Sequence, residues 1–168
     1  GIKAAMWCGA TIDPLGCAVT FNRACCKPDE VAGSDLVGKW FWFGEQPFLK
    51  VNLQGKRFCN ESGPYDYMLH SAFMQPYHTY VDIWDSDYVA QVKQLNEVGC
   101  CRLYPFDNGA PSNMDISAMQ SKFDQLEEAG YIQKADTMEE LAEKLNLPVE
   151  ATVETWNRYN MFAEQGKD

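Results

Sequence analysis

Apolar residues recur three or four positions apart in several parts of the chain, which is the pattern of helices with one buried face. Residues 1–13 show this spacing, and Asp13-Pro14 predicts the end of that helix. Further helices are predicted over residues 65–75, 86–96, 113–130, 136–146 and 147–166.

End signals support three of these helices. Gly130 suits a C-terminal cap, because glycine adopts a positive φ at little cost. Thr137 followed by Glu140 has the spacing of a capping box. Pro148 suits the first turn of the last helix, where a missing N–H is harmless.

Strand patterns are fewer and lie between the helices. Residues 47–60 predict a β-hairpin, with Gly55 in its tight turn. Residues 78–85 are rich in β-branched and aromatic side chains and predict a strand, and residues 131–134 predict a short one. Strands and helices do not alternate regularly, so an α+β fold is expected, with a small mixed or antiparallel sheet packed by several helices.

Residues 17–46 show no clean period and contain one proline and three glycines. A stretch this long without structure is unusual in a compact domain, so it is expected to be a lid or an insertion beside the hairpin. Four consecutive aromatic residues, 40–43, lie within it. They suit either core packing or the wall of a site for an apolar ligand.

Composition limits the function classes. The 168 residues are 46% hydrophobic and 13% aromatic, enough for the core of one domain. The formal net charge of −10 argues against binding to nucleic acid or to an anionic membrane surface. No apolar run approaches the ~18–20 residues of a membrane helix, and the N-terminus lacks the pattern of a signal peptide.

The cysteines are odd in number and include no C-x-x-C pair; they are Cys8, Cys17, Cys25, Cys26, Cys59, Cys100 and Cys101. Free, partly buried thiols in a reducing compartment explain them best, which favours the cytoplasm while leaving export of a parent protein open. A metal or redox role for Cys25-Cys26 or Cys100-Cys101 is the alternative.

Complete catalytic motifs are missing from the sequence: it has no glycine-rich dinucleotide or phosphate loop and no zinc-protease motif. His70 and His78 lack a carboxylate or cysteine at ligand spacing, so no metal site is expected. Residues 60–66 form a dense polar run just after a strand, where ligand-binding groups are common. Tyr65 follows Gly63-Pro64 there and suits either a proton-transfer group or a packed aromatic.

The stretch VNLQGKRFCNES resembles the motif V-N-x-x-G-x-R-F-x-N-E of flavoproteins related to fumarate reductases and succinate dehydrogenases. The matching residues are Val51, Asn52, Gly55, Arg57, Phe58, Asn60 and Glu61. Residues 1–13, 80–88 and 135–168 are also similar to stretches of that family. The resemblance is weakest at residues 14–46 and 97–113.

The resemblance implies that residues 1–168 are the substrate-capping domain of a two-domain flavoprotein, a piece of a longer protein without its FAD-binding domain. FAD would be bound by that other domain of the same chain, with Asn60 and Glu61 of the cap contributing to the cofactor site. No flavin is expected in the chain alone.

One departure from fumarate reductases changes the expected chemistry. Their proton-delivering arginine is replaced here by Tyr65, and NESGPY is instead similar to a motif of 3-ketosteroid dehydrogenases, where the tyrosine handles a proton beside the flavin. The resemblance thus implies an FAD-dependent oxidoreductase that reduces or desaturates a C–C bond of a small molecule next to an activating carbonyl, with Tyr65 catalytic. A non-catalytic module that kept the cap fold and recognises an apolar ligand or a protein is the alternative.

Overall fold

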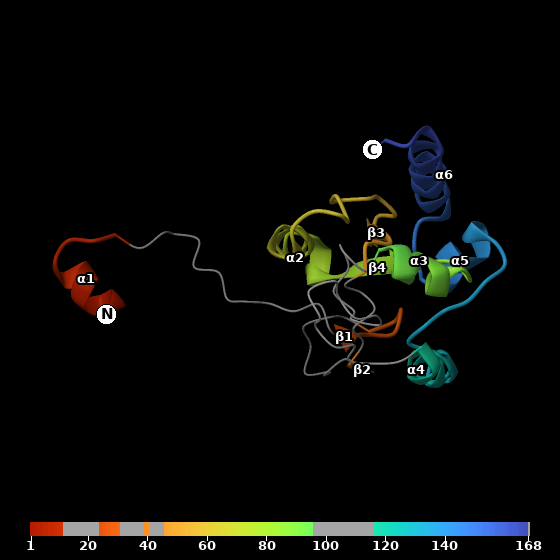
Figure 1. The fold of residues 1–168 in the computed structure, drawn as a ribbon, viewed down its shortest axis with the longest axis horizontal. Coiled ribbons are helices and arrows are strands. Elements are labelled where there is room, and N and C mark those ends of the chain that lie inside the picture. The colour runs from red at the N-terminus through yellow and green to blue at the C-terminus, as the bar shows by residue number, and fades with distance from the viewer. Residues whose placement is uncertain (12–23, 31–38, 41–45, 96–115, 168) are drawn as a thin grey trace.

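The structure, a computed structural model, describes residues 1–11, 24–30, 39–40, 46–95 and 116–167 (Figure 1). Its α-helices are α1 (Ile2–Trp7), α2 (Tyr65–Phe73), α3 (Tyr88–Gln94), α4 (Ile116–Glu128), α5 (Met138–Lys144) and α6 (Val149–Gln165). Its strands are β1 (Ala24–Cys25), β2 (Lys39–Trp40), β3 (Leu49–Asn52) and β4 (Tyr80–Ile83), and a 3-10 turn, η2, covers Pro76–His78. The predicted α+β class is confirmed.

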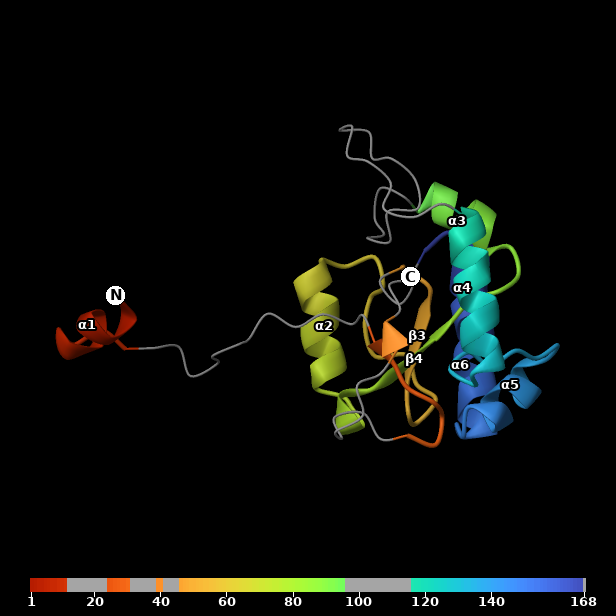
Figure 2. The ribbon, with the colours of Figure 1, turned by 90° about the horizontal axis from the view of Figure 1, so that it is seen from below.

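The strands pair in two small antiparallel sheets, β1 with β2 and β3 with β4. The predicted hairpin is present but short: β3 turns at Asn52–Gly55, and Val51 bridges to Arg57 on the returning segment. The predicted strand within residues 78–85 is β4, which pairs with the other edge of β3. In Figures 1 and 2 this sheet lies between α2 on one side and α5 and α6 on the other.

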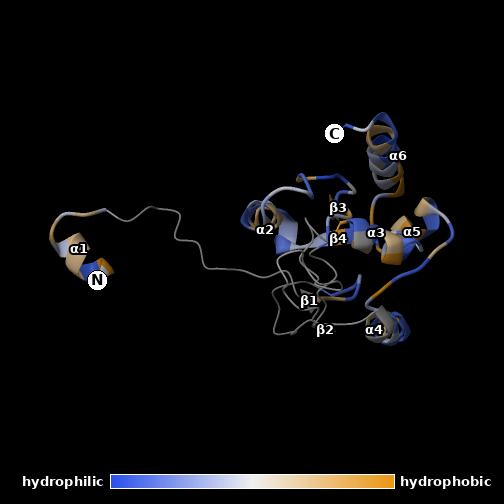
Figure 3. Ribbon diagram, in the orientation of Figure 1, coloured by the Kyte–Doolittle hydropathy of each residue, from blue (hydrophilic) through white to orange (hydrophobic). Residues whose placement is uncertain are grey.

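Two apolar clusters form most of the described core. The first joins α3 and α4 and consists of Phe48, Tyr88, Val92, Met119, Phe123 and Leu126. The second joins β3 and β4 to α5 and the start of α6 and consists of Leu49, Val51, Ile83, Ala142 and Leu147. Figure 3 shows the hydrophobic residues of β3 and the mixed, two-sided character of α6. The amphipathic pattern therefore marks the faces that pack on the sheet.

The predicted end signals are found at their helices. Thr137 is the N-cap of α5, and its hydroxyl accepts a hydrogen bond from the backbone N–H of Glu140 at 3.2 Å. Gly130 follows α4 with φ +83°, and its N–H donates to the carbonyl of Glu127. Pro148 is the N-cap of α6, one position before the first turn.

Two sequence predictions are wrong in detail. Residues 131–134 are not a strand: the N–H groups of Tyr131 and Ile132 both donate to the carbonyl of Leu126, which ties them to the end of α4. A segment this short becomes a strand only beside a partner strand, and Tyr131 and Ile132 instead pack on the first core cluster. Helix α1 ends at Trp7, earlier than predicted, because Gly9 has φ +93°.

The long segment 17–46 is described only in part. Cys25 packs on the first core cluster, and the side-chain amide of Asn146 donates to the carbonyl of Pro28 at 3.3 Å. Residues 24–30 thus lie against the helical part of the chain. Most of the segment, including residues 41–43 of the aromatic run, lies outside the described residues, so the lid or insertion stays a prediction.

Candidate functional site

The motif residues build the turn after β3 and fix it to α6. The side-chain oxygen of Asn52 accepts from the N–H groups of Gln54 and Lys56 at 3.0 and 3.1 Å. The carbonyl of Gly55 accepts from the hydroxyl of Thr155 on α6 at 2.7 Å. Gly55 has φ +72°, so both its conformation and its closeness to α6 require a residue without a side chain.

An ion pair holds the loop that follows. The guanidinium of Arg57 donates through Nε to Glu61 Oε1 at 2.9 Å and through Nη2 to Oε2 at 2.5 Å. The Glu61 side chain is only 3% exposed, and its Oε1 also accepts from the backbone N–H of Lys50 on β3 at 3.3 Å. The Glu61 carboxylate therefore connects the loop to Arg57, where the loop begins, and to Lys50 in the sheet.

The loop leads directly into α2. The side-chain oxygen of Asn60 accepts from the N–H of Ser62 at 2.9 Å, and its carbonyl accepts from Gly63 at 3.1 Å. Pro64 is the N-cap of α2, and Tyr65 is the first residue of the helix. The predicted catalytic residue thus begins a helix behind a hydrogen-bonded loop, although its side chain lies outside what the structure describes.

The two residues predicted to contribute to the cofactor site differ in exposure. Asn60 is exposed, whereas Glu61 is buried with its carboxylate bonded to Arg57. Of these two residues, Asn60 is therefore the one that lies at the surface.

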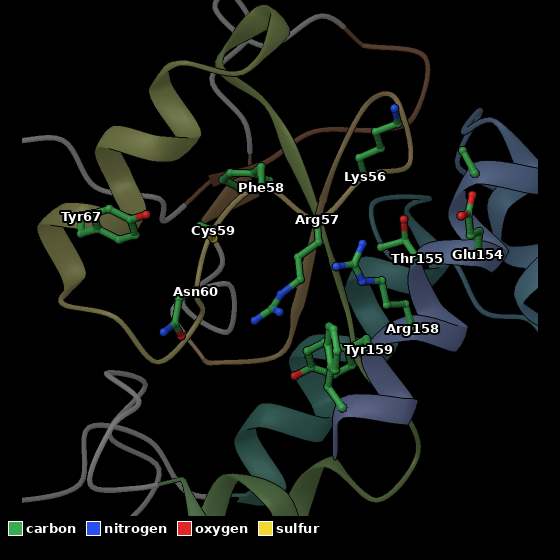
Figure 4. A pocket seen from close by; sticks show the side chains of 12 residues that line it. Lys56, Arg57, Phe58, Cys59, Asn60, Tyr67, Glu154, Thr155, Arg158 and Tyr159 are labelled. Carbon is green, nitrogen blue, oxygen red and sulfur yellow. The ribbon is translucent and has the colours of Figure 1, made fainter. Parts of the chain in front are cut away.

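A groove of about 730 Å³ lies between residues 56–60, α2 and α6 (Figure 4). Its lining combines aromatic rings with the cationic side chains of Lys56, Arg57 and Arg158. The guanidinium of Arg57 lies 5.3 Å from the centre of the Tyr159 ring. No local sequence pattern indicated this groove, because its two sides are about a hundred positions apart in the chain.

A second ionic pair lies in the sheet itself. Lys50 Nζ is 2.9 Å from Asp82 Oδ1 and donates to the carbonyl of Gln46 at 2.6 Å, with the Lys50 side chain 1% exposed. Burial raises the pKa of the Asp82 carboxyl to about 6, against the opposing effect of Lys50. A lysine between Leu49 and Val51 in an apolar strand was the sequence signal for such a pair.

The histidines show no metal arrangement. His70 is exposed on α2, while His78 stacks on Phe73 with ring centres 4.3 Å apart. Across the described residues, no group of three or more His, Cys, Asp or Glu side chains could hold a metal ion.

The described thiols differ in exposure. Cys8 is exposed, Cys25 and Cys26 are half-buried and Cys59 is buried. Burial raises the pKa of the Cys25 and Cys59 thiols to about 11, which disfavours the reactive thiolate. Cys17, Cys100 and Cys101 lie outside the described residues.

Bilayer-spanning helices are not found in the described part of the chain, where no helix combines the necessary length and apolar character.

The chain is similar to known oxidoreductases. The chain is 24% identical to a vinyl phenol reductase of Lactiplantibacillus plantarum over its whole length. It is 33% identical to a 3-oxosteroid 1-dehydrogenase of Mycolicibacterium smegmatis over 79% of its length, and 30% identical to an NADH:acrylate oxidoreductase of Vibrio harveyi over 72%. No family model matches the chain.

These relatives are oxidoreductases, and they confirm the resemblance to the fumarate reductase family that the motif indicated. The chain spans 34%, 22% and 10% of the lengths of these three proteins. It therefore corresponds to a part of each relative.

Proposed function

We propose that this chain is the substrate-capping domain of an FAD-dependent oxidoreductase that reduces or desaturates a C–C bond next to an activating carbonyl. The three relatives are by name a reductase, a dehydrogenase and an oxidoreductase, and the chain matches only a part of each. The observation that carries the proposal is the loop tied by Arg57 and Glu61, which delivers Tyr65 to the first position of α2.

FAD would be held by the other domain of the same chain and would supply or accept the hydride. The exposed amide of Asn60 fits a hydrogen bond to the cofactor. The carboxylate of Glu61 is bonded to Arg57, so Glu61 would serve the cofactor site by fixing the loop that carries Asn60.

Tyr65 would transfer the proton that accompanies the hydride. A proton-transfer group must be held within ~0.5 Å of its working geometry. Pro64 restricts the backbone just before Tyr65, and the helix that Tyr65 begins is anchored in a third apolar cluster by Met68 and Leu69. The tyrosine hydroxyl then needs only a partner base or acid in the substrate site.

The decisive experiment uses the protein that carries this cap together with its FAD-binding domain. Tyr65→Phe is expected to reduce turnover by ~10²–10⁴, the usual range for general acid–base catalysis, while flavin absorbance and thermal stability stay unchanged. Tyr77→Phe, an exposed tyrosine outside the loop, is the matched control. Normal turnover of Tyr65→Phe would refute the role of Tyr65.

The domain assignment has a separate test. The isolated chain is expected to fold without binding flavin, because its cofactor would be bound by the other domain. Absorbance of bound isoalloxazine in the purified chain would contradict the capping assignment.

A further inference from the structure

The groove beside the motif has aromatic walls from three segments of the chain. Phe58 lies on the returning arm of the hairpin, Tyr67 on α2, and Tyr159 and Phe162 on α6. Tyr67 is 54% exposed. A volume of about 730 Å³ lies within the ~300–1,000 Å³ typical of sites for small molecules. The groove therefore has the size and the surface for a planar apolar body.

The charge of the groove is opposite in sign to that of the whole chain. Of its cations, Arg57 is neutralised by Glu61, which leaves Lys56 and Arg158 facing one carboxylate, Glu154. One positive charge thus remains in the groove, in a chain whose formal net charge is −10. A ligand with a single negative charge matches it, whereas a dicarboxylate or a phosphate would need more cations.

The lining is held in place before any ligand arrives. Thr155 is bonded to the carbonyl of Gly55, and the guanidinium of Arg57 lies over the ring of Tyr159. The guanidinium of Arg158 lies 5.3 Å from the centre of the Phe162 ring, which sets a cation beside an aromatic wall. Ordering these side chains in advance reduces the entropy lost on binding.

We infer that this groove binds an aromatic monocarboxylate, with its ring between Tyr67 and the aromatic face of α6 and its carboxylate toward Arg158 and Lys56. The inference does not depend on the proposed redox function, because binding is measurable on the chain alone without flavin.

The test compares two probes of the same shape and different charge, trans-cinnamate and cinnamyl alcohol, in NMR titrations of the isotope-labelled chain at low salt and pH 7. Cinnamate is ionised at this pH, since carboxyl groups titrate near pH 4. Shifts are expected in residues 56–60 and 151–162, with cinnamate binding about three- to tenfold more tightly than the alcohol.

Variants then assign the charge and ring contacts. Arg158→Gln should bring the affinities for cinnamate and cinnamyl alcohol within about twofold of each other, without weakening the binding of the alcohol. Lys3→Gln, which removes an exposed cation on α1, should leave the preference for cinnamate unchanged. Tyr67→Ser should weaken both probes.

Three results would overturn the inference: equal affinity for acid and alcohol, an equal loss of both in Arg158→Gln, or shifts confined to residues outside the groove. An unaltered spectrum of Arg158→Gln away from the groove shows that the variant is folded, so a changed preference reports on the lost charge.

Discussion

Gly55 and Thr152 lie so close that a Cβ on Gly55 would be 2.4 Å from the hydroxyl oxygen of Thr152 and 2.9 Å from its backbone nitrogen. Thr152 is 1% exposed and its hydroxyl donates to the carbonyl of Pro148, so α6 cannot move aside without losing buried contacts. The glycine of the motif is therefore explained by the packing of the turn on α6.

Gly55→Ala should lower the free energy of unfolding by about 2–4 kcal/mol, because overpacking is added to the cost of a positive φ. Urea denaturation measures the change. Gly130→Ala is the matched control: Gly130 has φ +83°, but a Cβ there would meet only the Cδ atom of Lys27 at 4.0 Å. It should cost about 1 kcal/mol. Equal losses would show that backbone strain alone explains Gly55.

The raised pKa of Asp82 predicts a pH-dependent stability. The folded chain holds this proton up to a pH of about 6, whereas the carboxyl titrates near 3.8 when unperturbed. The native state binds more protons between these values, so the stabilisation is fully present below pH ~4 and is lost as the pH rises through about 6.

Urea denaturation of the chain and of Asp82→Asn at intervals from pH 4 to 7 checks this prediction. The stability of the unmodified chain relative to Asp82→Asn should fall across that interval. Asp136→Asn, which changes an exposed carboxyl, is the control and should show no such trend. A constant difference between the chain and Asp82→Asn would contradict the assigned shift.

Lys50 and Asp82 should also respond differently to single and to paired replacement. Lys50→Met leaves the Asp82 carboxyl buried without its partner and should cost about 3–5 kcal/mol near pH 7. Lys50→Met combined with Asp82→Leu removes both charges and should recover most of that loss, because two apolar side chains of similar volume can replace a buried pair. A double variant as unstable as the single one would indicate that the pair itself is strongly stabilising.

The helices were predictable from the sequence because their signals are local. Thr137 and Glu140 act within the first turn of the helix that they begin, and Gly130 acts directly after the last turn of the helix that it ends. The pairing of β3 with β4 was not predicted, because Lys50 and Asp82 are 32 positions apart and nothing local specifies that they face each other.

In the candidate site, too, local features were predictable from the sequence and contacts between distant residues were not. The loop up to Tyr65 was found because its residues are consecutive and resemble a known motif. The groove was not, because Tyr67 and Arg158 come together only when α6 packs beside the hairpin. Glu61 was expected near the cofactor, and no pattern in the sequence indicated that its carboxylate is bonded to Lys50 N–H.

That last contact distinguishes the Arg57–Glu61 pair from the Lys50–Asp82 pair and gives a further prediction. Arg57→Leu leaves the Glu61 carboxylate buried without its guanidinium and should cost about 3–5 kcal/mol. Arg57→Leu combined with Glu61→Leu should not recover the loss, in contrast to the Lys50–Asp82 pair. The carboxylate also accepts from the backbone N–H of Lys50, and an unsatisfied buried donor costs about 1–3 kcal/mol.

Arg57→Leu with Glu61→Gln is the informative third variant, because the amide oxygen of glutamine still accepts from that N–H. It should be more stable than the double leucine variant by roughly 1 kcal/mol in urea denaturation. If both double variants have the same stability, the bond from Lys50 to Glu61 contributes nothing. Glu61 would then hold the loop before Tyr65 through Arg57 alone.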